Sequence, residues 1–221
     1  LNPGDTMLLP DPGYPDYLSG VALAQVKLEL MSLSADNHYL PDYQQLDPKV
    51  VEQAKLMYLN YPHNPTGAVA TPEFYQDTVK FAKAHHIGVV QDFAYGAIGF
   101  DGKRPVSFLQ TPGAKDVGIE TYTLYKSYNM AGWRIGFAVG NADMIEAINL
   151  IQDHLFVSVF PAIQDAAIAA LNSDQSTVKT LVARYQQRHD DFYAAARKIG
   201  WEPYPSGGTF YAWMPVPKGY T

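Results

Sequence analysis

The sequence contains no cysteine, and its charged residues are few and mostly acidic. Without a thiol, disulfide bonds and thiolate chemistry are excluded, which fits a reducing cytoplasm. Charged residues make up 17% of the chain and give a net charge of −6, which argues against a nucleic-acid partner because such proteins present a basic face. No apolar run has membrane-spanning length and no signal peptide is recognised, so we expect no membrane partner.

Two common kinds of ligand site are also missing from the sequence. It has neither the glycine-rich fingerprint of dinucleotide-binding proteins nor the phosphate loop of nucleotide hydrolases. The 6 histidines lack the spacing of metal ligands. What the chain does have is 47% hydrophobic residues, enough for a globular core, and 16 tyrosines.

Short runs of β-forming residues alternate with helical runs, which predicts an α/β fold with a mostly parallel sheet flanked by helices. We expect the first strand to end at Pro10, and Thr71 to cap a helix that begins at Pro72. The predicted strands cover residues 6–9, 26–33, 56–60, 87–91, 121–125, 135–139 and 209–214. The predicted helices cover residues 17–23, 43–54, 72–86, 144–156, 162–171 and 175–199.

The helix over 175–199 is long enough to connect two domains. We therefore predict a large domain over 1–174, an inter-domain helix over 175–199 and the start of a small α+β domain over 200–221. The first and last residues fit the interior of a longer chain, so we expect a fragment of a larger protein.

Lys126 follows a run of β-forming residues. Long cations are seldom buried at the end of a strand without a partner or a function. A desolvated amine has a lowered pKa and can form a Schiff base with a carbonyl. Arg134 follows across a turn and could direct its guanidinium at a phosphate near that amine. The alternative is that both cations lie on a surface loop between two strands.

Asp92 closes the predicted strand over 87–91 and is followed closely by Tyr95. Ligands of parallel sheets bind beyond the carboxyl ends of the strands, where both residues are expected. A buried carboxylate needs a cationic partner, and a protonated pyridine nitrogen would be one. The alternatives are a helix cap or a loop salt bridge for Asp92 and a packed aromatic ring for Tyr95.

Asn64 and Tyr14 lie in proline-rich turns after two other strands. Asn64 is part of Asn-Pro-Thr-Gly, and its amide could donate a hydrogen bond to a ring oxygen. Tyr14 is part of Pro-Gly-Tyr-Pro and could stack on a cofactor ring. Each of the two could also be a simple turn residue, so the candidate residues taken together are stronger evidence for a cofactor site than either one alone.

Taken together, these motifs resemble the fold-type I pyridoxal-phosphate aminotransferases of class I/II over essentially the whole chain. The most specific matches are Asn-Pro-Thr-Gly, Asp-Phe-Ala-Tyr and Gly-Trp-Arg-Ile-Gly. The resemblance implies a cofactor role for seven residues: ring stacking by Tyr14, contact to the ring's phenolic oxygen by Asn64 and Tyr95, a partner for the ring nitrogen in Asp92, the Schiff base on Lys126, and phosphate contacts from Thr123 and Arg134.

The resemblance also implies a cytoplasmic homodimer that moves an amino group between an amino acid and a 2-oxo acid. Residues 129–141 and 210–221 are similar to the diaminopimelate aminotransferase-like branch, with aspartate, methionine and aromatic aminotransferases as close neighbours. Lys126 would act as general base and acid. The alternatives are a carbon–sulfur β-lyase or decarboxylase on the same scaffold, an effector-binding domain, and an inactive truncated domain.

The sequence departs from the family pattern in two places. Tyr125 replaces the small serine usual before the lysine, and Tyr17 stands where some members have a histidine behind Asp92. The family's glycine/serine phosphate turn and its substrate-carboxylate arginine are expected outside this chain. The resemblance further predicts cis bonds before Pro12 and Pro65.

Overall fold

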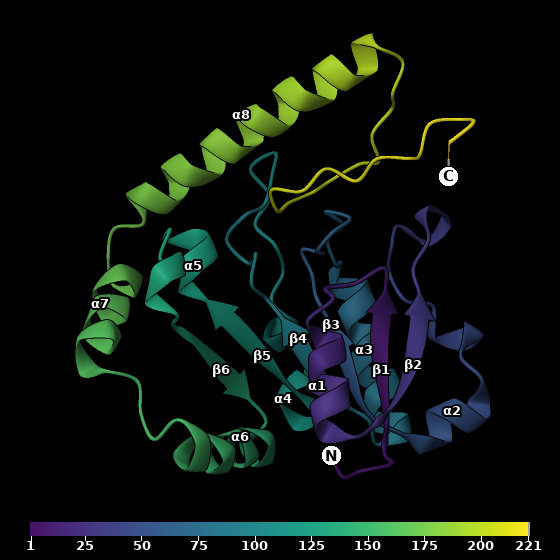
Figure 1. The fold of residues 1–221 in the computed structure, drawn as a ribbon, viewed down its shortest axis with the longest axis vertical. Coiled ribbons are helices and arrows are strands. Elements are labelled where there is room, and N and C mark those ends of the chain that lie inside the picture. The colour runs from purple at the N-terminus through teal and green to yellow at the C-terminus, as the bar shows by residue number, and fades with distance from the viewer. Residues whose placement is uncertain (221) are drawn as a thin grey trace.

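The computed structural model describes residues 1–220, so the last residue of the predicted segment 200–221 lies outside it. Its centre is one six-stranded sheet with the order β2-β1-β3-β4-β5-β6 (Figure 1). The strands are β1 Thr6–Asp11, β2 Lys27–Ser32, β3 Ala54–Leu59, β4 Gly88–Asp92, β5 Gly118–Thr123 and β6 Gly136–Gly140. Neighbouring strands are parallel except β5 and β6, which are antiparallel. The predicted α/β class with a mostly parallel sheet is confirmed.

Helices flank this sheet and then lead away from it (Figure 1). The α-helices are α1 Tyr17–Ala24, α2 Pro48–Gln53, α3 Pro72–His85, α4 Ala114–Val117, α5 Leu124–Ser127, α6 Ala142–Leu155, α7 Pro161–Leu171 and α8 Ser176–Lys198. Short 3₁₀ turns cover Ala35–Asn37, Tyr43–Gln45, Phe108–Gln110 and Ala131–Trp133. The long α8 lies apart from the sheet, and the chain after it runs back toward the carboxyl ends of the strands. Within residues 1–220 no helix is both long and apolar enough to span a membrane.

The helix α3 begins where the sequence predicts. The Thr71 side chain accepts a hydrogen bond from the Phe74 N–H at 3.2 Å, and Pro72 occupies the first turn, where its missing N–H costs nothing. One face of α3 is buried and includes Tyr75 and Val79.

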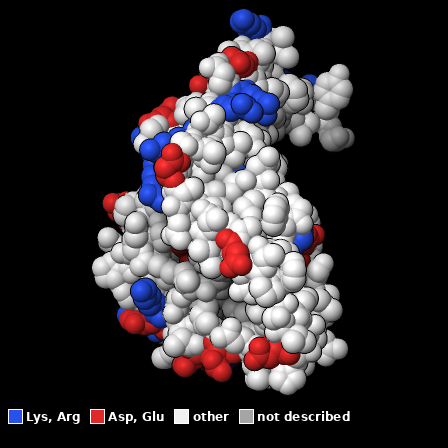
Figure 2. Space-filling model, turned by 90° about the vertical axis from the view of Figure 1, so that its left-hand side faces the viewer, with Lys and Arg blue, Asp and Glu red and all other residues white. Residues whose placement is uncertain are grey.

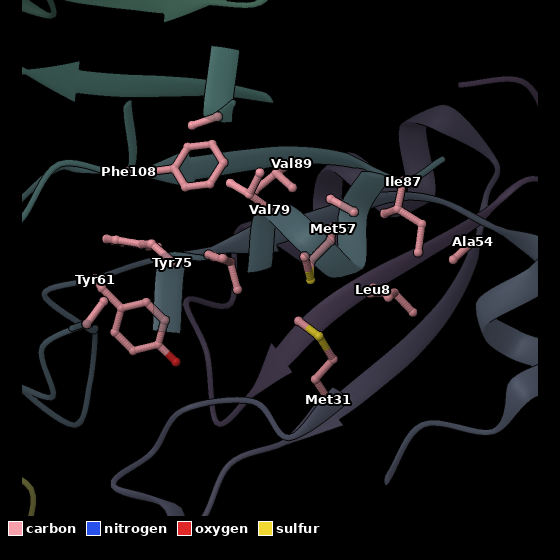
Figure 3. Close-up of a cluster of buried hydrophobic side chains, with 14 of the residues drawn as sticks. Leu8, Met31, Ala54, Met57, Tyr61, Tyr75, Val79, Ile87, Val89 and Phe108 are labelled. Atoms are coloured by element: carbon pink, nitrogen blue, oxygen red, sulfur yellow. The ribbon is translucent and has the colours of Figure 1, made fainter. Parts of the chain in front are cut away.

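The main hydrophobic core lies between this face of α3 and the sheet (Figure 3). The central strands β3 and β4 contribute Met57 and Val89, both fully buried, and Tyr75 and Phe108 close the cluster with rings 5.5 Å apart. Strands covered on both faces are apolar along their length rather than alternating. This core fixes the ends of β3 and β4, from which the pocket described below is built.

Two predictions in the first third of the chain are wrong. The strand β1 continues through Pro10 to Asp11. At Pro10 it pairs with β2 but no longer with β3, so the missing proline N–H interrupts no hydrogen bonding to β3. The predicted helix 43–54 is a 3₁₀ turn, a break before Pro48 and the short α2, since proline cannot continue a helix whose N–H groups must be paired.

Two further predictions are wrong nearer the C-terminus. The strand β5 covers Gly118–Thr123, so Leu124 and Tyr125, which the sequence predicts to end it, lie with Lys126 in the helical turn α5. The predicted strand 209–214 does not form, and residues 200–220 contain one isolated bridge, between Gly208 and Gly99. A strand needs a continuous partner, and here the neighbouring chain is a loop. The unpredicted α4 lies before β5.

The X–Pro bonds before Pro12 and Pro65 are cis as predicted, and the bond before Pro62 is cis as well.

Candidate functional site

A pocket of about 280 Å³ opens at the carboxyl ends of the parallel strands. Its walls come from segments spread over the chain, from the turn after β1 to the segment after α8. Six of the seven residues predicted from the sequence line it: Tyr14, Asn64, Asp92, Tyr95, Lys126 and Arg134. The seventh, Thr123, ends β5 just before the lysine turn, and its buried hydroxyl has no hydrogen-bond partner within residues 1–220.

Asp92 is the acidic group of the pocket. Its carboxylate accepts hydrogen bonds from the Tyr17 hydroxyl at 2.8 Å, the Ala94 N–H at 3.2 Å and the Thr121 hydroxyl at 3.4 Å. Burial raises the pKa of Asp92, while these three donors and the nearby Lys126 act in the opposite direction. A carboxylate desolvated in this way favours a cationic partner in the pocket that it lines.

Lys126 is held over the pocket by α5. Burial lowers the pKa of its amine, Asp92 opposes that effect, and the positive charge of Arg134 adds to it. The ammonium nitrogen also lies over three aromatic rings, with ring centroids 5.5 Å away at Tyr95, 5.3 Å at Tyr125 and 5.2 Å at Phe210. A lysine with a lowered pKa has more of its amine in the neutral, nucleophilic form.

Arg134 is the second cation of the pocket. It follows the 3₁₀ turn Ala131–Trp133 and has a left-handed backbone with φ of 50°. Within residues 1–220 its guanidinium forms no ion pair and donates no side-chain hydrogen bond. Among residues 1–220 its one cation–π contact is with Tyr125, whose ring centroid lies 5.1 Å from Cζ. A planar donor fork without a carboxylate partner is suited to an anionic ligand.

Asn60, which the sequence reading missed, fixes the turn that carries Asn64. Its side-chain amide donates to the Asp92 carbonyl at 2.7 Å, and its side-chain oxygen accepts from the Asn64 N–H at 2.9 Å. The end of β3 is thereby tied to the end of β4. The Asn64 side chain lines the pocket without a hydrogen-bond partner within residues 1–220.

Tyr14 and Tyr17 form the wall on the β1 side. Their rings meet edge to face with centroids 5.5 Å apart, and Tyr17 also packs on Tyr58 at 5.0 Å. The Tyr14 hydroxyl donates to Asp16 at 2.5 Å, and this bond raises the pKa of Tyr14 to about 12. The predicted stacking residue is therefore held by its neighbours through both its ring and its hydroxyl.

Tyr211 reaches the pocket from the far end of the chain. Its hydroxyl lies 3.1 Å from that of Tyr95, and the two rings meet edge to face. Backbone hydrogen bonds tie its segment down, from Gly207 N to Gly67 O at 2.9 Å and from Thr209 N to Ile98 O at 3.1 Å. Because Tyr95 and Tyr211 are 116 residues apart in sequence, no local pattern could have paired them.

The residues of the pocket fit pyridoxal phosphate. An unpaired arginine suits a phosphate, a desolvated carboxylate suits a protonated ring nitrogen, and a lysine of lowered pKa suits an aldehyde. Thr123 does not line the pocket, but its buried hydroxyl has no hydrogen-bond partner within residues 1–220. The part of the chain that the structure describes holds no cluster of side chains suited to a metal ion. A second cavity of about 350 Å³ lies along α8, but it lacks this combination of groups.

Comparison with known proteins agrees with this chemistry. The family model for aminotransferase class I and II matches residues 1–219. The chain is 63% identical over 221 residues to the L-glutamine–4-(methylsulfanyl)-2-oxobutanoate aminotransferase of Bacillus subtilis, covering 100% of this chain and 56% of that protein. It is 47% identical over 221 residues to the LL-diaminopimelate aminotransferase of Dehalococcoides mccartyi, again covering 100% of this chain and 57% of the relative.

Solved structures give the same result. The substrate-bound structure of BacF from Bacillus subtilis superposes with a TM-score of 0.97 at 50% identity, covering 100% of this chain and 56% of that one. An aminotransferase from Staphylococcus aureus superposes with a TM-score of 0.95 at 45% identity, covering 100% of this chain and 58% of that one. The chain therefore spans little more than half the length of the proteins it matches.

Proposed function

The chain belongs to the class I and II aminotransferases, a pyridoxal-phosphate-dependent family, and from this we propose that the whole protein moves an amino group between an amino acid and a 2-oxo acid. The observation that carries the proposal is the pocket that joins a desolvated carboxylate, a lysine of lowered pKa and an unpaired arginine. The same three groups would have little reason to meet in a purely structural site, where buried charges are normally paired.

When bound, pyridoxal phosphate supplies an aldehyde that condenses with amines and a protonated ring that accepts electrons. In our proposal Asp92 holds the proton on the ring nitrogen, since its carboxylate is already fixed by three donors. Asn64 and Tyr95 would donate hydrogen bonds to the ring oxygen, and Tyr14 would stack on the ring. Thr123 and Arg134 would hold the phosphate.

Lys126 would be both the attachment point and the proton carrier. Burial and the charge of Arg134 lower the pKa of its amine, which increases the share of the neutral form that a general base requires. The amine nitrogen lies over the rings of Tyr95, Tyr125 and Phe210, which shield part of it from solvent.

For the substrates we propose the pair named for the Bacillus subtilis relative, L-glutamine as donor and 4-(methylsulfanyl)-2-oxobutanoate as acceptor. The support is the higher identity, 63% against 47% for the LL-diaminopimelate aminotransferase of Dehalococcoides mccartyi. This choice places the protein outside the diaminopimelate branch that the motifs suggest. The aromatic lining of the pocket suits a thioether side chain.

A direct experiment combines a binding assay with turnover. Pyridoxal phosphate is added to the protein, the mixture is reduced with borohydride, and peptides are mapped by mass spectrometry. We expect the adduct on Lys126, and amino transfer from glutamine faster than from LL-diaminopimelate. An adduct on another lysine would refute the site, while ammonia and pyruvate released without an acceptor oxo acid would indicate a β-lyase instead.

We further propose the division into a large cofactor domain over 1–174, a connecting helix over 175–199 and the start of a small domain from 200, and a cytoplasmic homodimer. The separation of α8 from the sheet supports the division (Figure 1). Figure 2 shows few charged groups on the side where α6 and α7 lie, where these apolar residues are exposed: Leu150, Ile151, Leu155, Phe156, Val157 and Phe160. Light scattering of the whole protein tests the dimer, and a monomer would exclude it.

A further inference from the structure

Tyr125 departs from the usual family pattern, and the structure places its ring beside both cations of the pocket. The ring centroid lies 5.3 Å from the Lys126 nitrogen and 5.1 Å from the Arg134 Cζ. A cation over the face of an aromatic ring is attracted by the ring quadrupole, and arginine can also stack its planar fork on it. Tyr125 lines the pocket, and its hydroxyl makes no hydrogen bond within residues 1–220. The ring itself is therefore what this residue contributes.

The two cations depend on this ring to different degrees. Lys126 has two other aromatic contacts, Tyr95 at 5.5 Å and Phe210 at 5.2 Å, and is carried by the hydrogen-bonded turn α5. Arg134 has only the Tyr125 ring among the aromatic contacts of residues 1–220, and it has no ion pair there. Loss of the ring should therefore affect the arginine far more than the lysine.

We propose that Tyr125 is a positioning residue that holds the Arg134 guanidinium in place for the phosphate group of the ligand. The inference rests on the proposed function, because it takes Arg134 to be the phosphate-binding residue. Fixing a flexible side chain before binding removes an ordering cost that the ligand would otherwise have to offset. The small serine usual at this position could not provide such a contact.

The test compares two ligands that differ only in the phosphate. Dissociation constants of pyridoxal phosphate and of pyridoxal are measured by absorbance for the wild type, Tyr125→Leu and Tyr125→Phe. A cation–π contact of ordinary strength predicts that Tyr125→Leu binds pyridoxal phosphate roughly threefold to tenfold more weakly. Binding of pyridoxal should change by less than about twofold, because Lys126 keeps its other rings. Tyr125→Phe keeps the ring and should match the wild type.

Trp133→Leu is the matched control. It removes an aromatic ring next to Arg134 in sequence, but Trp133 is exposed and has no cation over its ring within residues 1–220. We expect its ratio of the two dissociation constants to equal that of the wild type. The ratio is internal to each variant, so a general loss of stability in Tyr125→Leu leaves it interpretable.

The outcomes separate this inference from the proposed function. An unchanged ratio in Tyr125→Leu, with normal adduct formation on Lys126 in the wild type, overturns the role of Tyr125 and leaves the function standing. A wild type that takes up neither ligand overturns both. A selective loss of pyridoxal phosphate binding in Tyr125→Leu, absent from Tyr125→Phe and Trp133→Leu, supports the inference.

Discussion

Replacing Tyr17 by phenylalanine removes one hydroxyl group, which donates to Asp92 Oδ2 over 2.8 Å. The ring contacts with Tyr14 and Tyr58, at 5.5 and 5.0 Å, should survive because phenylalanine has the same ring. The pKa of Tyr17 is raised well above its usual value, mainly by burial, so its hydroxyl stays protonated and able to donate across the working pH range. The substitution therefore isolates one charge-assisted hydrogen bond.

The unfolding free energy that Tyr17→Phe is expected to lose depends on whether Asp92 is ionised. A hydrogen bond to an ionised group contributes about 1.5–3 kcal/mol, against about 0.5–1.5 kcal/mol between neutral groups. Because burial raises the pKa of Asp92 in the folded protein, its contribution to stability is fully present below the unfolded-chain pKa and is lost as pH rises through the folded pKa. Tyr17→Phe raises that folded pKa further, so its destabilising effect should grow with pH.

The assay is urea unfolding of wild type and Tyr17→Phe at about pH 7.5 and below about pH 4, where carboxyl groups gain protons. We expect a loss in unfolding free energy of about 1.5–3 kcal/mol at the higher pH and a smaller one at the lower pH. Tyr58→Phe is the control, since Tyr58 touches the same ring but makes no hydrogen bond within residues 1–220. An equal loss at both pH values would refute the reasoning.

Three other substitutions test separate parts of the structure. Lys126→Ala should abolish amino transfer and the borohydride-trapped adduct, and turnover within tenfold of the wild type would exclude the proposed role. Thr71→Ala should lower the unfolding free energy by about 1 kcal/mol through loss of the α3 cap, measured by urea unfolding. Gly208→Ala would bring a Cβ within 2.4 Å of the Ile98 carbonyl oxygen and should cost about 1–3 kcal/mol and speed amide exchange at Thr209. Gly20→Ala, with open space around it, is the control for Gly208→Ala and should leave that exchange unchanged.

The sequence predicts the sheet and the position of the site because both depend on local patterns. Apolar runs such as the one that ends at Asp92 form strands, and the polar residue that follows each strand lies at the carboxyl edge of the sheet. Turn chemistry at Asn64 and the cap at Thr71 are equally local. For that reason six of the seven predicted residues meet in one pocket, although their roles in cofactor binding stay a prediction.

The features that the sequence does not predict depend on contacts between distant segments. Asn60 looks like the end of a strand, and only the fold brings its side chain to the Asp92 carbonyl. Tyr211 lies in a run of mostly aromatic and apolar residues that predicts a strand, but without a partner strand the backbone of this segment bonds to loops instead. Tyr17 and Tyr125 stand out in the sequence only as departures from a family pattern. In the fold, Tyr17 donates a hydrogen bond to Asp92, and the Tyr125 ring contacts Arg134.

The charges of the pocket also explain why the position of Arg134 matters to Lys126. Asp92 raises the pKa of the Lys126 amine, so the carboxylate acting alone would favour the protonated, unreactive form of that amine. Burial and the positive charge of Arg134 both act against Asp92, and the net result is a lowered pKa. An anion bound at Arg134 would cancel part of the arginine's effect, so anion binding and deprotonation of Lys126 oppose each other. By fixing Arg134, the Tyr125 ring therefore influences both the affinity of Arg134 for an anion and the reactivity of the Lys126 amine.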